Sequence, residues 1–225
     1  MRRLVLAAVI AAPAALAAPA AQAHLFSFSD VSPANRIVTD QGTMEVLKAT
    51  WYEQSLADSG FSLSYNTNYL VGQVGAPDLV YNNYFVFDLS GLSGAITSAM
   101  FELESFEVDT SLDGAAAVTY SLFDVGTPIS ELTSSQSNRG DIWADLASGA
   151  AYGARVYTNA DSNTVQSIAL SGDAIAAINA ARLGGATQFA IGGTLAPLTA
   201  TPEPATAAVL GLGLAGLLAA RRRRG

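Results

Sequence analysis

The sequence predicts a mainly β domain, an antiparallel β-sandwich of the jelly-roll type with two short helices. Between residues 24 and 200, apolar and polar residues alternate with a period of two far more often than with the 3.6-residue period of a helix. Turn-forming residues interrupt this alternation at short intervals, and the segment is rich in Ser, Thr, Gly, Tyr and Phe. Many short strands of this kind are typical of a sandwich.

Each strand is predicted where alternating apolar residues lie between two turn signals. The predicted strands are Met44–Trp51, Phe61–Tyr65, Tyr69–Val71, Tyr81–Leu89, Ile96–Val108, Ala116–Val125, Arg155–Thr158, Val165–Leu170 and Gln188–Thr194. Residues 195–200 are predicted to form a linker, so the domain is expected to span 24–194.

The strand predicted at Ile96–Val108 changes phase within its length. Its apolar residues occupy odd positions up to Leu103 and even positions from Phe106 onward. Because side chains alternate strictly between the two faces of a strand, one extra residue is needed to keep a single buried face. We therefore predict a β-bulge near Ser105.

Two helices are predicted late in the domain. Asp141 can cap a helix over Ile142–Ser148, which Gly149 would end. Ser171 or Asp173 can cap a second helix that runs to Arg182, with Ile175 and Ile178 facing the core and Gly184-Gly185 ending it.

The domain is strongly acidic once the chain ends are set aside. Residues 24–200 carry five basic residues against eighteen acidic ones, a net charge of −13, within a chain whose formal charge is −8. Such a surface repels nucleic acid, which excludes that class of partner. The chain has no cysteine, so neither disulfides nor thiolate chemistry contributes.

The N-terminus has the three parts of a secretory signal peptide, predicted here to span residues 1–23. Arg2 and Arg3 form a basic region, an Ala-rich apolar stretch follows, and Ala21 and Ala23 occupy the positions that signal peptidase recognises. Cleavage after Ala23 would leave His24 as the first residue. Export is the expected outcome.

The C-terminus, 201–225, combines a turn motif, an apolar stretch and a cationic end. The Pro202, Glu203 and Pro204 residues precede an apolar segment, 205–220, predicted to form a transmembrane helix of about 24 Å. Arg221, Arg222, Arg223 and Arg224 follow it. Since arginines beside a membrane helix stay on the cytoplasmic side, residues 24–200 are expected outside.

This C-terminal arrangement resembles the PEP-CTERM sorting signal, in which a Pro-Glu-Pro motif, a short Gly- and Leu-rich helix and an arginine cluster follow in that order. The resemblance implies that an exosortase, a membrane protease, cleaves at or near Pro202–Pro204. It also implies a protein of the cell envelope or surface in bacteria that make extracellular polysaccharide and biofilm matrix, anchored in the inner membrane either transiently or stably.

The segment Asn83–Glu104, which contains Phe-Asp-Leu-Ser-Gly-Leu-Ser-Gly-Ala-Ile-Thr, resembles a stretch of secreted DNRLRE-like and carbohydrate-binding-module-like jelly-roll domains. Residues 142–149, 177–182 and 189–193 resemble the later part of PEP-CTERM proteins of that type. These stretches form turns and core, so the resemblance implies a fold and carries no catalytic residue.

Two kinds of chemistry stay open on the residues alone. Glu102 with Glu104, or Glu107 with Asp109, would project from one strand face about 6.5–7 Å apart, which would suit a glycosidase or lyase that uses paired carboxylates. Acids that alternate with apolar residues are, however, what the solvated face of any half-buried strand displays, and this interpretation is favoured. Asp109, Asp113 and Asp124 lie near predicted turns and are candidates for a structural Ca²⁺, although they form no known calcium motif.

Aromatic residues offer a third possibility, because tyrosine and tryptophan can stack on sugar rings. The candidates are Trp51, Tyr52, Tyr65, Tyr69, Tyr81, Tyr84 and Trp143. If several were exposed on one face, polysaccharide binding would follow. The sequence as a whole predicts a non-catalytic exported protein with a structural or polysaccharide-binding role and no cofactor beyond a possible Ca²⁺, and the carbohydrate-active enzyme is the alternative.

Overall fold

The computed structural model describes residues 24–26, 32–54, 59–73, 79–110 and 116–197. The strands are β1 His24–Phe26, β2 Arg36–Thr39, β3 Gly42–Gln54, β4 Ser59–Phe61, β5 Val71–Gln73, β6 Val80–Asp88, β7 Ala99–Ser105, β8 Glu107–Asp109, β9 Val118–Phe123, β10 Ala151–Tyr157, β11 Thr164–Ala169 and β12 Gln188–Pro197. The helices are α1 Ile129–Leu132, α2 Gly140–Asp145 and α3 Gly172–Leu183, with a 3₁₀ turn at Asn159–Asp161. The prediction of a mainly β domain with few helices is confirmed.

The twelve described strands form one connected sheet, and every strand pair in it is antiparallel. Its main path runs β10-β9-β12-β6-β3-β2-β7-β11. The two end strands of this path approach each other. The Ser171 N–H donates to the Tyr152 carbonyl at 2.8 Å, and a Cβ on Gly153 would lie 2.7 Å from the Ala169 carbonyl oxygen. The sheet is therefore nearly closed.

Strand β3 connects the two sides of the sheet. Its first residues, Gly42–Glu45, pair with β2, and the remainder, from Val46, pairs with β6. A register shift between Val46 and Lys48 separates the two halves. Because a bulge bends a strand and increases its local twist, this shift lets one strand belong to both sides of the fold.

Aromatic rings from opposite sides of the fold meet in the core. Phe101 on β7 contacts Phe85 and Phe87 on β6 edge to face, with ring centroids 5.0 and 5.5 Å apart. The Tyr69 ring also packs against the Phe85 ring, with the two ring centroids 5.2 Å apart. All four side chains are buried, so the ring contacts fasten the two sides of the sheet together.

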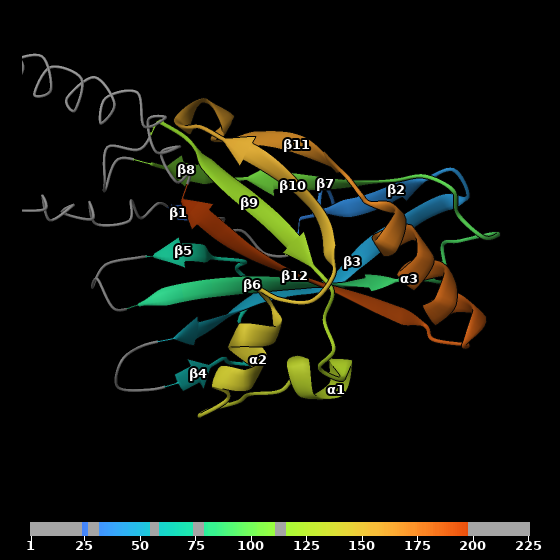
Figure 1. Ribbon diagram of the computed structural model, residues 1–225, viewed down its shortest axis with the longest axis horizontal. Coiled ribbons are helices and arrows are strands. Elements are labelled where there is room, and N and C mark those ends of the chain that lie inside the picture. The colour runs from blue at the N-terminus through green and yellow to red at the C-terminus, as the bar shows by residue number, and fades with distance from the viewer. Residues whose placement is uncertain (1–23, 27–31, 55–58, 74–78, 111–115, 198–225) are drawn as a thin grey trace, which may run out of the picture.

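Strand β6 is buried on both faces, with seven consecutive buried residues, Tyr81–Phe87. Phe85 and Phe87 face the main core, whereas Tyr84 and Val86 contact a second apolar cluster that includes Leu132, Ile142 and Leu146. The short helices α1 and α2 thus form a third layer over the outer face of the sheet, while α3 lies at one end (Figure 1). A strand that is covered twice explains the nearly continuous apolar pattern of its sequence.

The predicted phase change near Ser105 is confirmed, although it takes a different form from a single bulge. The ladder between β7 and β11 ends at Ser105, and β8 pairs instead with β1. Phe106 lies between the two strands and is 48% exposed, while Val108 returns to the core. The predicted β-bulge near Ser105 is therefore wrong, because the chain changes partner strand at Phe106.

Other predicted elements differ from the structure in specific ways. The strand predicted at Phe61–Tyr65 is wrong beyond Phe61, since the Asn66 N–H donates to the Leu63 carbonyl and closes a turn. Helix α2 begins at Gly140, and Asp141 provides no side-chain cap. Strand β12 continues to Pro197, so its last three residues occupy the predicted linker. Strand β2 and helix α1 were not predicted.

The second predicted helix is confirmed in detail. Helix α3 begins after Ser171, whose hydroxyl accepts from the Ala174 N–H at 3.3 Å. Ile178 is fully buried, and Ile175 is partly buried against the core. Gly184 caps the C-terminus, and Gly185 takes the left-handed conformation with φ of +80°.

None of the helices in the described residues has the length and apolar character needed to span a bilayer. The predicted signal peptide, 1–23, and the predicted membrane helix, 205–220, lie outside the residues that the structure describes.

Candidate functional site

The residues predicted to be processed lie almost entirely outside the described part of the chain. This holds for Ala21, Ala23, the Pro202–Pro204 motif and the arginine cluster 221–224. His24 is the exception. It is the first residue of β1, where its Cα partners are Gly72 on β5 and Asp109 on β8. The first strand of the described residues therefore begins at the residue that follows the predicted cleavage position.

The candidate catalytic acids lie on two strands, β7 and β8, that pair with different neighbours. The Glu102 carboxylate forms an ion pair with Arg36 on the neighbouring strand β2, with an Nε–Oε2 distance of 2.7 Å. The backbone of Glu104 accepts a hydrogen bond from the Tyr69 hydroxyl at 3.0 Å. Glu107 and Asp109 belong to the separate strand β8. One acid of the first pair is thus already held by an arginine.

The structure gives a separate partner to one of the calcium candidates. Asp124 accepts a hydrogen bond from the Tyr152 hydroxyl at 2.6 Å, whereas Asp109 lies on β8 and Asp113 is outside the described residues. Within the described ranges, no group of three or more acidic or histidine side chains is arranged to hold a metal ion.

Most candidate aromatic residues are buried, with polar groups paired inside the protein. Tyr52 donates to the Leu132 carbonyl at 3.2 Å, Tyr81 donates to Glu53 at 2.9 Å, and Trp143 donates to the Val80 carbonyl at 3.1 Å. Tyr65 differs from them, because it is 76% exposed. A broad strip of exposed aromatic rings is therefore not formed by these seven residues.

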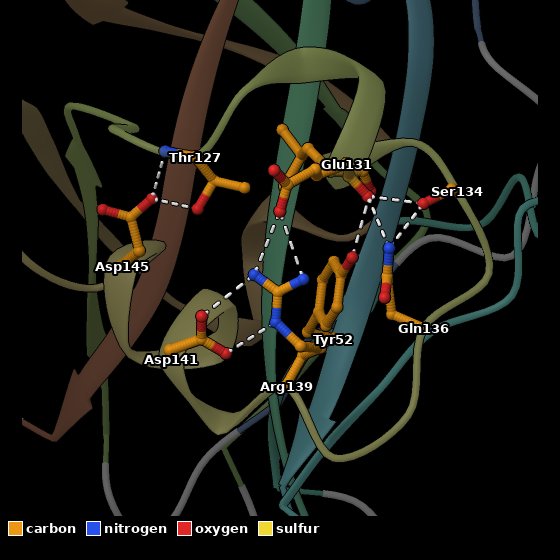
Figure 2. Close-up of polar contacts among 9 residues, drawn as sticks. Tyr52, Thr127, Glu131, Ser134, Gln136, Arg139, Asp141 and Asp145 are labelled. Atoms are coloured by element: carbon orange, nitrogen blue, oxygen red, sulfur yellow. Dashed lines mark hydrogen bonds and ion pairs between the residues drawn. The ribbon is translucent and has the colours of Figure 1, made fainter.

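The best-defined polar cluster joins the two outer helices and is centred on Arg139 (Figure 2). The Arg139 guanidinium binds Asp141 through two contacts of 2.9 Å. It also donates through Nη1 and Nη2 to one oxygen of Glu131 on α1, both at 3.2 Å. The cation therefore bridges an acid of α1 and an acid of α2.

Two further sets of contacts hold the layer formed by α1 and α2. One joins the loop before α1 to α2, and the other joins α1 to the sheet. The Thr127 N–H and hydroxyl both donate to Asp145, at 2.8 and 2.7 Å. The Tyr52 hydroxyl reaches up from β3 to the last residue of α1 (Figure 2). Burial raises the pKa of Tyr52 to about 12, with a smaller opposing influence from Arg139.

The electrostatics of the Arg139 cluster are those of a structural ion group. The hydrogen bond from Arg139 lowers the pKa of Asp141, and the reciprocal contact raises the pKa of Arg139. Both partners consequently keep their charges over the whole physiological range. Asp141 therefore neither accepts nor donates a proton near neutral pH, and its ion pair with Arg139 serves to join the two helices.

Four of the five basic side chains in the acidic domain form contacts within the protein, and the fifth is Arg182 on α3. Arg36 pairs with Glu102, Arg139 with Glu131 and Asp141, and Arg155 with Asp161 at 3.6 Å. The Lys48 ammonium donates to the carbonyls of residues 64 and 66. Acidic residues therefore dominate the charge of the domain surface. This charge reinforces the expected repulsion of polyanions.

Sequence patterns signalled only part of this surface. Pro128 at the start of α1 and Glu131 in its first turn are start signals for a helix, and they could have predicted α1. No local pattern marks Lys48 as a bridging residue, because its partners, the carbonyls of residues 64 and 66, come from another segment of the chain.

The comparison with known proteins identifies the C-terminal segment. Residues 200–224 match the family model of the PEP-CTERM protein-sorting motif. The chain therefore carries a PEP-CTERM sorting motif, which indicates an exosortase-sorted, exported protein associated with the cell envelope. No curated protein and no solved structure matches the chain.

Proposed function

We propose that this protein is a non-catalytic component of the cell envelope or extracellular matrix, where the β domain has a structural or polysaccharide-binding role. The observation that carries the proposal is the sorting motif at residues 200–224. In this scheme, signal peptidase cleaves after Ala23, and an exosortase cleaves at or near Pro202–Pro204.

The use of the acidic residues supports a non-catalytic role. Glu102 is paired with Arg36, Asp124 accepts from Tyr152, and Asp141 is held by Arg139. A glycosidase needs one carboxyl group with a raised pKa and a second that is free to act as nucleophile or base. Hydrogen bonds lower the pKa values of Asp40, Asp88 and Asp141, so these three acids are not suited to act as a general acid.

The charge pattern supports the proposed topology. Arg221–Arg224 would stay on the cytoplasmic side of a helix formed by residues 205–220, and the acidic domain would lie outside. The same acidic surface keeps copies of the domain apart and solvated, which suits a secreted protein.

Fractionation of the native host tests the sorting step. The measurement follows the wild-type protein and a variant with Pro202, Glu203 and Pro204 all changed to alanine. We expect the wild type at the surface or in the matrix in a shortened form, and the variant in the inner membrane at full length. A Thr199→Ala variant, altered just before the matched segment, is the control and should be processed normally.

Unaltered processing of the triple-alanine variant would overturn the exosortase step. Deletion of the host exosortase gives an independent measurement, since it should reproduce the variant's behaviour with the wild-type sequence.

A further inference from the structure

A loop that wraps around one edge of β3 holds the most exposed aromatic ring of the described residues. We call Ser62–Leu70 the edge loop. Strand β2 pairs with the first part of β3 and β4 with its end, both on the side opposite β6. The edge loop follows β4 directly and contacts β3 through Lys48 and Trp51, in the stretch between these two pairings.

The edge loop is fastened at several points. Ser62 and Gln136 exchange two backbone hydrogen bonds of 3.0 Å, and the Ser64 N–H donates to the Ser135 hydroxyl at 3.0 Å. From the other side, the indole N–H of Trp51 donates to the Asn68 side-chain oxygen. The α1–α2 connection and strand β3 thus hold the loop between them.

Lys48 fixes the part of the loop that carries Tyr65. Its ammonium group donates to the Ser64 carbonyl at 2.7 Å and also to the Asn66 carbonyl, so it bridges the residues on either side of Tyr65. Burial lowers the pKa of Lys48, which means that a cation is partly withdrawn from water to make these bonds. The turn closed by Asn66 N–H to Leu63 O completes the support.

The consequence is a ring that is held out in solvent. With both neighbouring carbonyls bound to one ammonium group, the backbone at Tyr65 is anchored, and the Tyr65 side chain on it is 76% exposed. Residues with hydroxyl and amide side chains adjoin Tyr65 in the sequence, Ser64 on one side and Asn66, Thr67 and Asn68 on the other. An exposed aromatic face on an anchored backbone suits a sugar ring, because the C–H face of the sugar is apolar and can stack on the aromatic ring.

We propose that Tyr65, on the edge loop, is a contact site for a pyranose ring of a neutral polysaccharide. This inference rests on the polysaccharide-binding form of the proposed function and names its binding residue and ligand class. Neutral polymers are selected because the domain carries a net charge of −13 and four of its five basic side chains, Arg36, Lys48, Arg139 and Arg155, are paired within the protein. A polymer of uronic acids would be repelled.

Affinity electrophoresis of the mature protein from the native host tests the site. The gels contain either the neutral polysaccharide fraction of the host matrix or alginate, a polyanion. We expect retardation by the neutral polymer and none by alginate. Tyr65→Ala should weaken binding about tenfold, a typical effect of removing one stacking ring, whereas Tyr65→Phe, which keeps the ring face, should bind within about twofold of wild type.

Leu183→Ala is the matched control, because Leu183 is an 82% exposed apolar residue on α3, away from the edge loop. It should bind as wild type does, and all variants should melt at the wild-type temperature. Retardation of Tyr65→Ala equal to that of wild type would overturn the Tyr65 site and leave the proposed function standing. A wild-type protein that neither polymer retards would overturn both the site and the polysaccharide-binding role.

Discussion

The Tyr120 hydroxyl on β9 donates a 2.8 Å hydrogen bond to the Asn83 side-chain oxygen on β6, across the strand that lies between them. That intervening strand is β12, and Gly193 is the residue beneath the bond. A Cβ at Gly193 would lie 2.1 Å from the Tyr120 oxygen and 2.4 Å from the Asn83 oxygen. The Asn83 amide donates in turn to the Tyr69 carbonyl at 3.0 Å, so a polar chain crosses a closed core.

The first prediction concerns Gly193. Gly193→Ala should lower the free energy of unfolding by about 3 kcal/mol, because the methyl group forces apart two buried polar groups that cannot move into free space. Urea denaturation measures the effect. Gly172→Ala is the control, since a Cβ there meets nothing within 4 Å. Equal stabilities of the two variants would contradict the packing described for β12.

The second prediction separates two buried tyrosines. Tyr120→Phe should cost about 1–2 kcal/mol, because it leaves the Asn83 oxygen without its donor in the core. Tyr157→Phe should cost much less. The Tyr157 hydroxyl is buried but makes no protein hydrogen bond of acceptable geometry, although nearby Ser105 opposes the rise in its pKa. Thermal unfolding of both variants checks the order, and the reverse order would refute it.

The third prediction concerns alkaline pH. Burial raises the pKa of a set of tyrosines above the ordinary value of 10, and these are Tyr52, Tyr81, Tyr84, Tyr120, Tyr152 and Tyr157. Above pH 10 the unfolded chain releases these protons more readily than the folded one, so stability falls as pH rises. For Tyr52 the loss extends from pH 10 to about 12.

The ultraviolet absorbance of phenolate tests this expectation. Absorbance and circular dichroism should change together in one cooperative step above pH 10, because these tyrosines ionise as the fold opens. Ionisation of the six tyrosines well before any loss of structure would contradict the burial that the core gives them.

The fourth prediction concerns the closure of the sheet. The Ser171 hydroxyl caps α3 and also donates to the Ala151 carbonyl on β10 at 2.9 Å. Ser171→Ala should therefore lower the free energy of unfolding by about 1 kcal/mol, in the normal range for a lost N-cap. Hydrogen exchange should quicken in α3 and at the seam between β10 and β11. Ser167→Ala, at an exposed position of β11, is the control and should exchange as wild type does.

The sequence predicts elements whose signals are local and fails where distant segments decide the structure. Strand β6 and helix α3 are confirmed because an apolar run and an N-cap serine are local signals. The partner change at Phe106 is foreshadowed by the slipped alternation. Residues 62–65 look like a strand, yet they form the edge loop, because Lys48 and Gln136, both distant in sequence, bind their backbone.

The candidate site divides in the same way. The sorting motif is contiguous, so its residues can be identified from the sequence alone. Tyr65 cannot be distinguished from Tyr52 or Tyr84 by sequence, since all three tyrosines lie in or beside segments in which polar and apolar residues alternate. Burial decides between them, and burial depends on α1 and α2 covering the outer face of the sheet.

The mass of the mature protein, isolated from the native host and mapped at both ends, tests the sorting account most directly. We predict that the N-terminus is His24, the first residue of β1, and that the chain ends at or near Pro202–Pro204. Recovery of an intact polypeptide with Met1 and the Arg221–Arg224 cluster still attached, in the soluble cytoplasmic fraction, would contradict the account.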